Sequence, residues 1–293
     1  MGDYNGFDRE PSMDEISLVS GADSDNKEHI ELGDDISLVS GTESGTESGS
    51  EAHSESAEEL YLLGKGMYEQ GNYAKAKEYL EKAFELGMVE ACHELGRLYE
   101  QEEDYTKARE WYEAGVRRGD KLSMCALGEL YFDGRGVKQS YAEAFRYYSM
   151  AEGAQTTQRL FNMAWMYQNG KGTKKDYAKA LQYYERMAEL AQDGDMTDDL
   201  YKETALAMLG IMYAKGNGCK ADFRKAVSCF GTAAELGDDV SAWCLGCCYE
   251  YGGRGIKKNM YLAHYWYKKA AEMGNAAAAK KLKKRKWDKF KPN

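Results

Sequence analysis

The sequence holds few of the residues on which catalysis depends. It contains only four histidines, and two of them lie within the first 56 residues, where we expect no fold. No Gly-x-Ser-x-Gly, Walker loop or His-Glu-x-x-His occurs. We therefore predict a protein that is not an enzyme, with no catalytic residues, no metal and no cofactor.

Proline and long apolar runs are also scarce. Only two prolines occur in 293 residues, which favours helix because proline interrupts helix interiors. No window reaches the ~18 apolar residues of a membrane span. The first residues lack the basic and then apolar pattern of a secretory signal. We therefore expect no membrane span and no signal-directed secretion.

The seven cysteines are an odd number and show no regular pairing. Free thiols in a reducing cytosol explain them most simply, so we expect a cytoplasmic protein. Cys244, Cys247 and Cys248 could supply zinc ligands together with His264, but zinc sites usually combine two such pairs. We favour small buried side chains, and a redox or metal role for these thiols stays open.

Charge is concentrated at one end of the chain. Residues 1–56 hold fifteen Asp and Glu against Arg9 and Lys27, a net charge of −13, so the remainder carries −10 + 13 = +3. Serine, glycine and acids dominate this segment, which cannot bury enough surface to offset its ordering entropy. We predict a disordered acidic Ser/Gly-rich tail over residues 1–56.

Two copies of Ile-Ser-Leu-Val, twenty residues apart, interrupt this tail. Each is β-prone and flanked by acid and serine, which suggests a strand that pairs with another sheet edge. The copies resemble a SUMO-interacting motif, whereas a duplicated linker is the simpler alternative. The candidate recognition residues are Ile16, Leu18, Val19, Ile36, Leu38 and Val39.

The stretch from Ala126 to Ala151 predicts two short amphipathic helices joined by a glycine turn. Leu127 and Tyr131 lie four residues apart in the first helix, and an apolar stripe marks the second. Gly134 and Gly136 interrupt the pattern, because glycine readily adopts positive φ. One such hairpin cannot bury both of its apolar faces alone.

Repetition of this hairpin solves that problem. Its Leu-Gly-x-x-Tyr core, or a variant of it, recurs every 32 to 46 residues, with its glycine or alanine at Gly64, Gly96, Gly128, Ala164, Gly210 and Gly246. Helix pairs at this period indicate an all-α solenoid. We expect about six pairs over residues 57–274, and a capping helix with a basic tail over residues 275–293.

These residues resemble the Sel-1-like repeat family, a branch of the tetratricopeptide superfamily whose inter-helix loop carries Gly-x-Gly. The loops with Gly134, Gly170, Gly216 and Gly253 match it, whereas the first two units are shorter and look like plain tetratricopeptide repeats. The resemblance implies a right-handed superhelix whose first helices line a concave groove. It also implies a scaffold or adaptor role.

In such superhelices, positions two before, two after and five after the motif leucine point to the concave face. We therefore expect these residues to bind a partner: Tyr61, Lys65, Tyr68, His93, Arg97, Glu100, Glu129, Phe132, Phe161, Trp165, Gln168, Ile211, Trp243, Glu250 and Tyr251. Aromatic anchors with a polar surround are typical of a binding surface. The alternative is that neighbouring units bury these rings.

Three hypotheses for function follow. The leading one is a monomeric, non-catalytic adaptor that binds a protein or peptide partner in the concave groove. The second is an exported or cell-envelope relative with ligand-binding or β-lactam-related enzymatic activity. The third is a nuclear or nucleic-acid-associated adaptor that uses the basic cluster at Lys280–Lys286. We expect no nucleic acid, because a solvated face explains that cluster better.

Overall fold

The computed structural model describes residues 56–284 and Trp287, apart from residues 155, 191–195 and 254. The predicted disorder of the tail and its two Ile-Ser-Leu-Val copies therefore lie outside the described residues, except for Ser56. Ser56 begins the fold, because its hydroxyl accepts the Glu59 amide while the Glu59 carboxylate accepts the Ser56 amide. This capping box fixes the start of the first helix.

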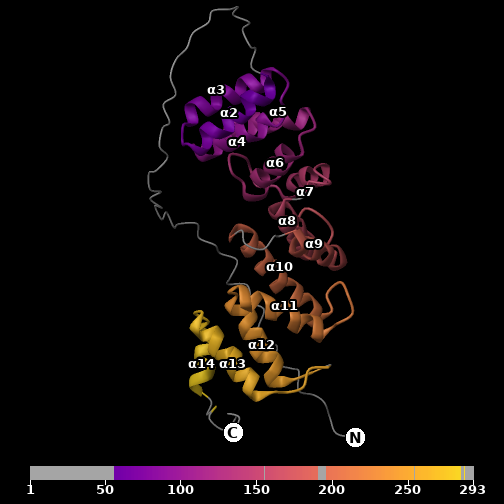
Figure 1. Ribbon diagram of the computed structural model, residues 1–293. Coiled ribbons are helices and arrows are strands. Elements are labelled where there is room, and N and C mark those ends of the chain that lie inside the picture. The colour runs from indigo at the N-terminus through magenta and orange to yellow at the C-terminus, as the bar shows by residue number, and fades with distance from the viewer. Residues whose placement is uncertain (1–55, 155, 191–195, 254, 285–286, 288–293) are drawn as a thin grey trace, which may run out of the picture. The chain divides into compact units, whose positions relative to one another are not determined.

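Helices make up about three quarters of the described residues (Figure 1). They are α2 (Ala57–Glu69), α3 (Tyr73–Glu85), α4 (Ala91–Gln101), α5 (Tyr105–Arg117), α6 (Lys121–Asp133), α7 (Tyr141–Met150), α8 (Thr157–Asn169), α9 (Tyr177–Leu190), α10 (Met196–Lys215), α11 (Phe223–Leu236), α12 (Asp239–Tyr251), α13 (Met260–Glu272) and α14 (Ala276–Lys284). Each helix packs mainly against those before and after it. We number the successive pairs α2–α3 to α12–α13 as units one to six. The prediction of an all-α solenoid of six helix pairs with one further helix is confirmed.

Glycine lets the two helices of a unit approach closely. In unit five, a Cβ at Gly210 would lie 2.5 Å from the ring of Phe230, which is 3% exposed. The same relation joins Gly128 to Tyr148 and Gly246 to Tyr267. The ring of the second helix therefore occupies the space that a side chain on the first helix would need.

The second glycine of each Gly-x-Gly loop connects neighbouring units. Gly136, Gly172 and Gly218 have positive φ, and a Cβ on them would collide with Tyr105, Tyr141 and Tyr177 respectively. Each of those tyrosines is the first residue of the preceding unit's second helix. Each of these loops therefore contacts the N-terminus of the second helix of the preceding unit.

Unit one departs from the repeat pattern at its motif leucine. Leu63 is 41% exposed, whereas Leu95, Leu127, Leu209 and Leu245 are buried. The motif leucine of a later unit packs against helices on both sides. Within the described residues no helix precedes α2, so Leu63 has a neighbour on one side only.

Polar contacts join units three and four. Arg159 on α8 is 4% exposed, and its guanidinium donates to the Tyr148 carbonyl at 2.8 Å and to the Ala154 carbonyl at 3.1 Å. Asn162 donates to the Tyr148 hydroxyl at 2.8 Å. The bond to Tyr148 satisfies a carbonyl in the last turn of α7, where carbonyls have no intrahelical partner, and the bond to Ala154 fixes the loop that follows.

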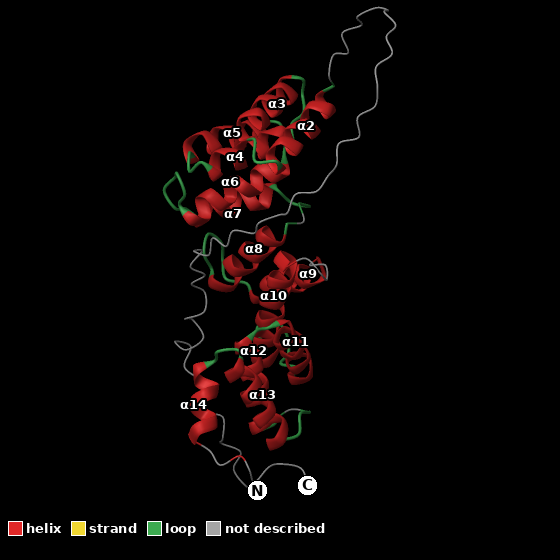
Figure 2. Cartoon of the chain, turned by 60° about the vertical axis from the view of Figure 1, so that its left-hand side comes forward, coloured by secondary structure: helices red, strands yellow, loops and turns green. Residues whose placement is uncertain are grey.

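The last helix closes the array at α12 and α13 (Figure 2). Trp287, which follows α14, is 5% exposed and packs on the rings of His264 and Tyr267. We expected the lysines of this helix to face water, and Lys280 does. Lys281 does not, because its ammonium lies 2.5 Å from the carboxylate of Glu250, which is 5% exposed.

Candidate partner-binding face

The residues predicted for the concave groove lie on the first helices of the units, and we call this set the first-helix face. Only Lys65, Arg97 and Tyr251 are fully exposed. Glu250 is buried, and the others are half-buried. The face is therefore a row of side chains supported by their neighbours and open to solvent on one side.

A small pocket lies between α2 and α4. It has a volume of about 130 Å³, and its lining includes Lys65, Tyr68, Leu80, Glu94 and Arg97. The Arg97 guanidinium lies 5.8 Å from the centre of the Tyr68 ring and 3.4 Å from Glu94. The pocket thus combines two cations and two carboxylates, Glu69 and Glu94, with an aromatic wall and an apolar base.

His93 lies beside this pocket on α4. Its Nδ1 is 3.6 Å from the Glu94 carboxylate, and its ring centroid is 6.2 Å from that of Tyr112. On α2, the Lys65 ammonium lies 5.7 Å from the ring centre of Tyr61. These contacts orient predicted binding residues before any partner arrives.

Glu100 of the face and the neighbouring Asp133 converge on one arginine. Arg135, from the Gly-x-Gly loop of unit three, lies 3.0 Å from Glu100 and 3.2 Å from Asp133. Burial raises the pKa of Glu129 to about 7, the Arg135 charge opposes that shift, and the Glu100 charge adds to it. Glu129 therefore changes its charge near neutral pH.

An aromatic cluster joins units three and four. Phe132 on α6 lies 5.3 Å from Trp165 on α8 and 5.3 Å from Tyr141 on α7, measured between ring centroids. Trp165 and Tyr141 are 5.5 Å apart. All three rings are half-buried. The neighbouring unit thus covers part of each ring and leaves part open.

The face continues along α8 and α10 with less polar character. Phe161 packs 6.4 Å from Tyr184, and Ile211 packs against the same hydrophobic core. The Oε1 atom of Gln168 is buried and has no hydrogen-bond partner in the described structure. A buried amide oxygen without a donor favours a ligand that supplies one.

The C-terminal end of the face is covered by the chain itself. The Lys281 ammonium lies 5.4 Å from the Trp243 ring centre and 5.3 Å from that of Tyr251. The Glu250 carboxylate accepts the Tyr267 hydroxyl at 2.6 Å. Trp243 and Glu250 therefore hold α14 in place, and only Tyr251 remains open to solvent.

Three residues of this region were missed from the sequence. Arg135 and Tyr141 lie outside the first helices, and Lys281 stands in a run of lysines. Arg135 stands between the two glycines of the unit-three loop, and this position in the sequence could have predicted its contact with unit two. Nothing in the sequence distinguishes Lys281 from the lysines around it.

The cysteines of α12 do not form a metal centre in the described structure. No group of three or more His, Cys, Asp or Glu that could hold a metal ion occurs among the described residues. Burial raises the pKa of the Cys248 thiol to about 11 and raises those of Cys244 and Cys247. His264 stacks on Trp287 at 5.2 Å. Neutral thiols of this kind are poor nucleophiles.

The described helices also bear on the membrane prediction. None of them combines the length and the apolar composition that a membrane crossing requires.

Comparisons with known proteins identify the repeats. The Sel1 repeat model matches residues 121–152, 160–191, 204–238 and 241–275. Tetratricopeptide repeat models match residues 57–87 and 89–118. The tetratricopeptide matches end and the Sel1 matches begin at the boundary between units two and three. Units one and two lack the Gly-x-Gly turn that the later units carry. No curated protein matches the chain.

Solved structures agree with these models. A Sel1 repeat protein from Oxalobacter formigenes is 28% identical, with a TM-score of 0.61, over 76% of this chain and 86% of that one. A structure of pilF from Pseudomonas aeruginosa has a TM-score of 0.52 at 15% identity, over 78% of this chain and 97% of that one, and shows the fold alone. The repeat scaffold is one typical of protein-interaction adaptors and is generally non-catalytic. With four Sel1 repeats that follow two tetratricopeptide repeats, the chain belongs to the Sel1-like repeat proteins of the tetratricopeptide superfamily.

Proposed function

We propose that this protein is a non-catalytic adaptor that binds a segment of another protein along the first-helix face of units one to four. The observation that carries the proposal is the pairing of the pocket at Arg97 with the open aromatic cluster at Trp165. Most of the binding energy of an interface comes from a few anchor residues, and a charged pocket and a set of half-buried rings can supply such anchors. Units five and six contribute less, since α14 covers Trp243 and Glu250.

The chemistry of the face describes the partner. Lys65 and Arg97 favour a carboxylate at one end of the bound segment. The rings of Phe132 and Trp165 favour an aliphatic or aromatic side chain toward the other end. The carboxylates between them, Glu100 and Glu129, favour a backbone or side-chain donor. The partner is therefore an extended or helical segment with an acid and an apolar anchor.

A displayed library of random peptides tests this proposal. Peptides that the full chain enriches are synthesised, and their Kd values are measured by fluorescence anisotropy. Arg97→Glu and Trp165→Ala should each weaken binding by about 30-fold or more, which corresponds to about 2 kcal/mol. Tyr265→Ala is the matched control, because Tyr265 is 49% exposed on α13, away from the face. Peptides that bind all variants equally would place the binding site elsewhere.

We also propose that the adaptor acts as a monomer in a reducing compartment. The seven cysteines are free thiols, and two of them, Cys92 and Cys125, are buried in the core. Oxidative pairing would have to disrupt the helices that hold them. Light scattering and subcellular fractionation test both statements. A stable dimer in dilute solution, or accumulation outside the cytosol, would contradict them.

A further inference from the structure

The loops inside units four, five and six form a second charged surface, which we call the basic edge. It consists of residues 169–179, 215–225 and 251–258. Its described cations are Lys171, Lys174, Lys175, Lys179, Lys215, Lys220, Arg224, Lys225, Lys257 and Lys258. With Arg254 these segments carry eleven cations against two carboxylates, a net charge of 11 − 2 = +9. In the described part of the chain, the corresponding loops of units one and two are not basic. The segment Glu100–Asp104 in unit two is acidic.

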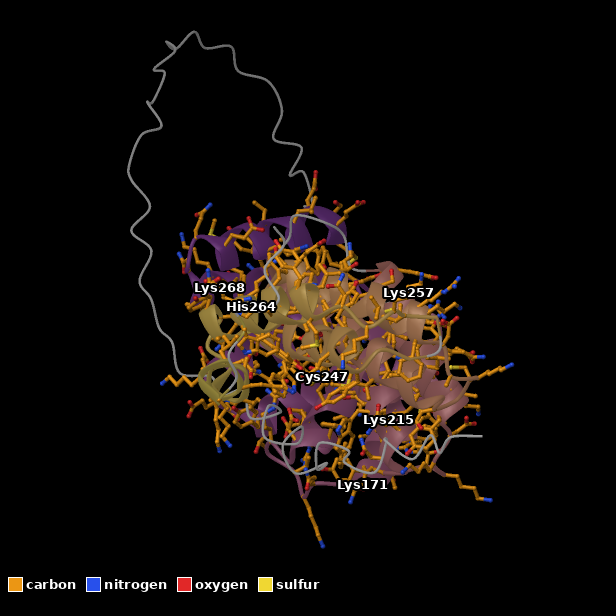
Figure 3. The ribbon with its side chains drawn as sticks, turned by 90° about the horizontal axis from the view of Figure 1, so that it is seen from below. Lys171, Lys215, Cys247, Lys257, His264 and Lys268 are labelled. Atoms are coloured by element: carbon orange, nitrogen blue, oxygen red, sulfur yellow. The ribbon has the colours of Figure 1, made fainter. Side chains whose placement is uncertain are left out.

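Contacts between the loops make this edge continuous. A Cβ on Gly218 of the unit-five loop would collide with the backbone of Tyr177, which follows the unit-four loop. A Cβ on Gly255 of the unit-six loop would lie 2.9 Å from the Arg224 side chain, which follows the unit-five loop. Figure 3 shows Lys171, Lys215 and Lys257 on one side of the array, away from Lys268.

These cations are available to a ligand. All ten are exposed. Apart from Lys215, none lies within 4.0 Å of a carboxylate in the described structure. Both carboxylates of the edge are engaged elsewhere, since Asp176 accepts the Lys179 amide and Asp222 accepts the Arg224 and Lys225 amides.

The opposite edge of the same units carries the opposite charge. Asp238 and Asp239 stand at the start of α12, and Glu203 lies close to them on α10. Burial and the charges of Asp238 and Asp239 raise the pKa of Glu203. Units four to six are therefore polarised across their width, and only one edge attracts an anionic ligand.

We propose that the basic edge binds an extended acidic segment of a partner protein, independently of the first-helix face. Successive first helices pack at about 10 Å, so three loops span roughly 20 Å. About seven residues of extended chain, at ~3.3 Å each, cover that distance. An acid at every third residue would place one carboxylate against each loop.

The structure favours an acidic polypeptide over nucleic acid. The N-termini of α9 and α11, which could bind phosphates, are already capped by Asp176 and Asp222. Lys225 lies over the Tyr213 ring, and that ring is 8% exposed. The Tyr213 ring therefore offers no face on which a base could stack, and Lys281 already lies over the ring of Tyr251, the exposed tyrosine of the edge.

Fluorescence anisotropy with the full chain tests the proposal. The probe is a fluorescein-labelled poly-glutamate peptide of about twelve residues at low salt. The test variant replaces four exposed lysines of the edge by glutamine: Lys171, Lys174, Lys220 and Lys257. The matched control replaces four exposed lysines elsewhere, which changes the net charge equally: Lys75, Lys121, Lys268 and Lys280. Circular dichroism confirms that both variants fold.

The expected result is poly-glutamate binding that weakens about tenfold in the test variant, changes less than about twofold in the control, and falls steeply with added salt. Four results would overturn the proposal. One is no binding of the peptide at low salt. The second is an equal loss in the control variant, which would assign binding to net charge. The third is tighter binding of a thymidine oligonucleotide of the same length, which would make the edge a nucleic-acid surface. Arg97→Glu separates this surface from the first-helix face: a loss of poly-glutamate binding as large as that of the test variant would assign the binding to the pocket at Arg97 and overturn the proposal.

Discussion

Replacing Gly210 by alanine tests how each helix pair is held together. Gly210 lies where α10 crosses α11, and an added Cβ would lie 2.5 Å from Phe230 Cε1. Real Cβ atoms do not approach so closely, so the ring or the helix must move. Phe230 is 3% exposed and has no free space to move into. Overpacking of this kind costs about 1–3 kcal/mol, and Gly210→Leu should cost more.

Gly231 provides a matched control in the same unit. It lies within α11, and a Cβ placed on it would meet no atom within 4 Å. Its φ is not positive, so alanine fits the backbone without strain. Gly231→Ala should therefore stabilise the protein by about 0.5–1 kcal/mol, because alanine has less backbone freedom to lose on folding. The same chemical change is thus expected to have opposite signs at two positions about 20 residues apart.

Urea unfolding of the full chain, followed by circular dichroism, measures both effects. Gly210→Ala should lower the midpoint, and Gly231→Ala should raise it. Because stability in a repeat array is shared with neighbouring units, hydrogen exchange should show faster opening in units four and six as well as in unit five. Midpoints that move in the same direction for both variants would show that the crossing is not tight.

Further substitutions test polar contacts. Arg159→Met should lower the free energy of unfolding by about 1–3 kcal/mol, because it leaves the buried Tyr148 carbonyl and the half-buried Ala154 carbonyl without a donor; an unchanged urea midpoint would show that the bonds contribute nothing. The raised pKa of Glu129 means that the folded state binds its proton more tightly than the unfolded state. The protonated Glu129 side chain therefore contributes fully to the free energy of unfolding at pH values below the usual carboxyl range. This contribution is lost as pH rises through about 7. Glu129→Gln should match wild type near pH ~5 and melt higher near pH ~8, and a difference independent of pH would contradict this. Lys281→Met should destabilise unit six by about 1–3 kcal/mol, with recovery when Glu250→Gln is added; no recovery would mean that packing of the lysine chain dominates.

The repeat architecture could be predicted from the sequence because its determinants are local. The small residue of the motif, its leucine and the ring of the second helix recur at fixed spacing, and each is required by the geometry of one helix pair. Capping residues mark the helix starts, as at Asp104 and Ser140. Glycines with positive φ mark the loops. Leu63 is the exception, since its burial depends on a neighbour outside its own unit.

The environment of individual face residues could not be predicted, because it depends on contacts between units. The sequence places Trp165, two residues after its motif residue, and Trp243, two residues before its motif leucine, on the same predicted face. In the structure Trp165 packs in a ring cluster, while Trp243 lies under Lys281. The difference arises from α14, which is about 40 residues from Trp243 and whose lysines look alike in sequence.

The two proposed surfaces use different parts of the repeat. The core uses the motif leucine, its glycine and the opposing ring, so the position five residues after the leucine is free to vary along the array. It holds Tyr68, Glu100, Phe132 and Gln168 in successive units. That variation gives the first-helix face a succession of distinct subsites. The basic edge instead uses the loop between the two helices of a unit, with Lys171 between the two loop glycines and Lys174 and Lys175 after them. Because neither set contributes to the helix crossings, substitutions on one surface should leave both the fold and the other surface intact. An adaptor of this design can therefore engage two partner segments at once, and change its preference for either one independently.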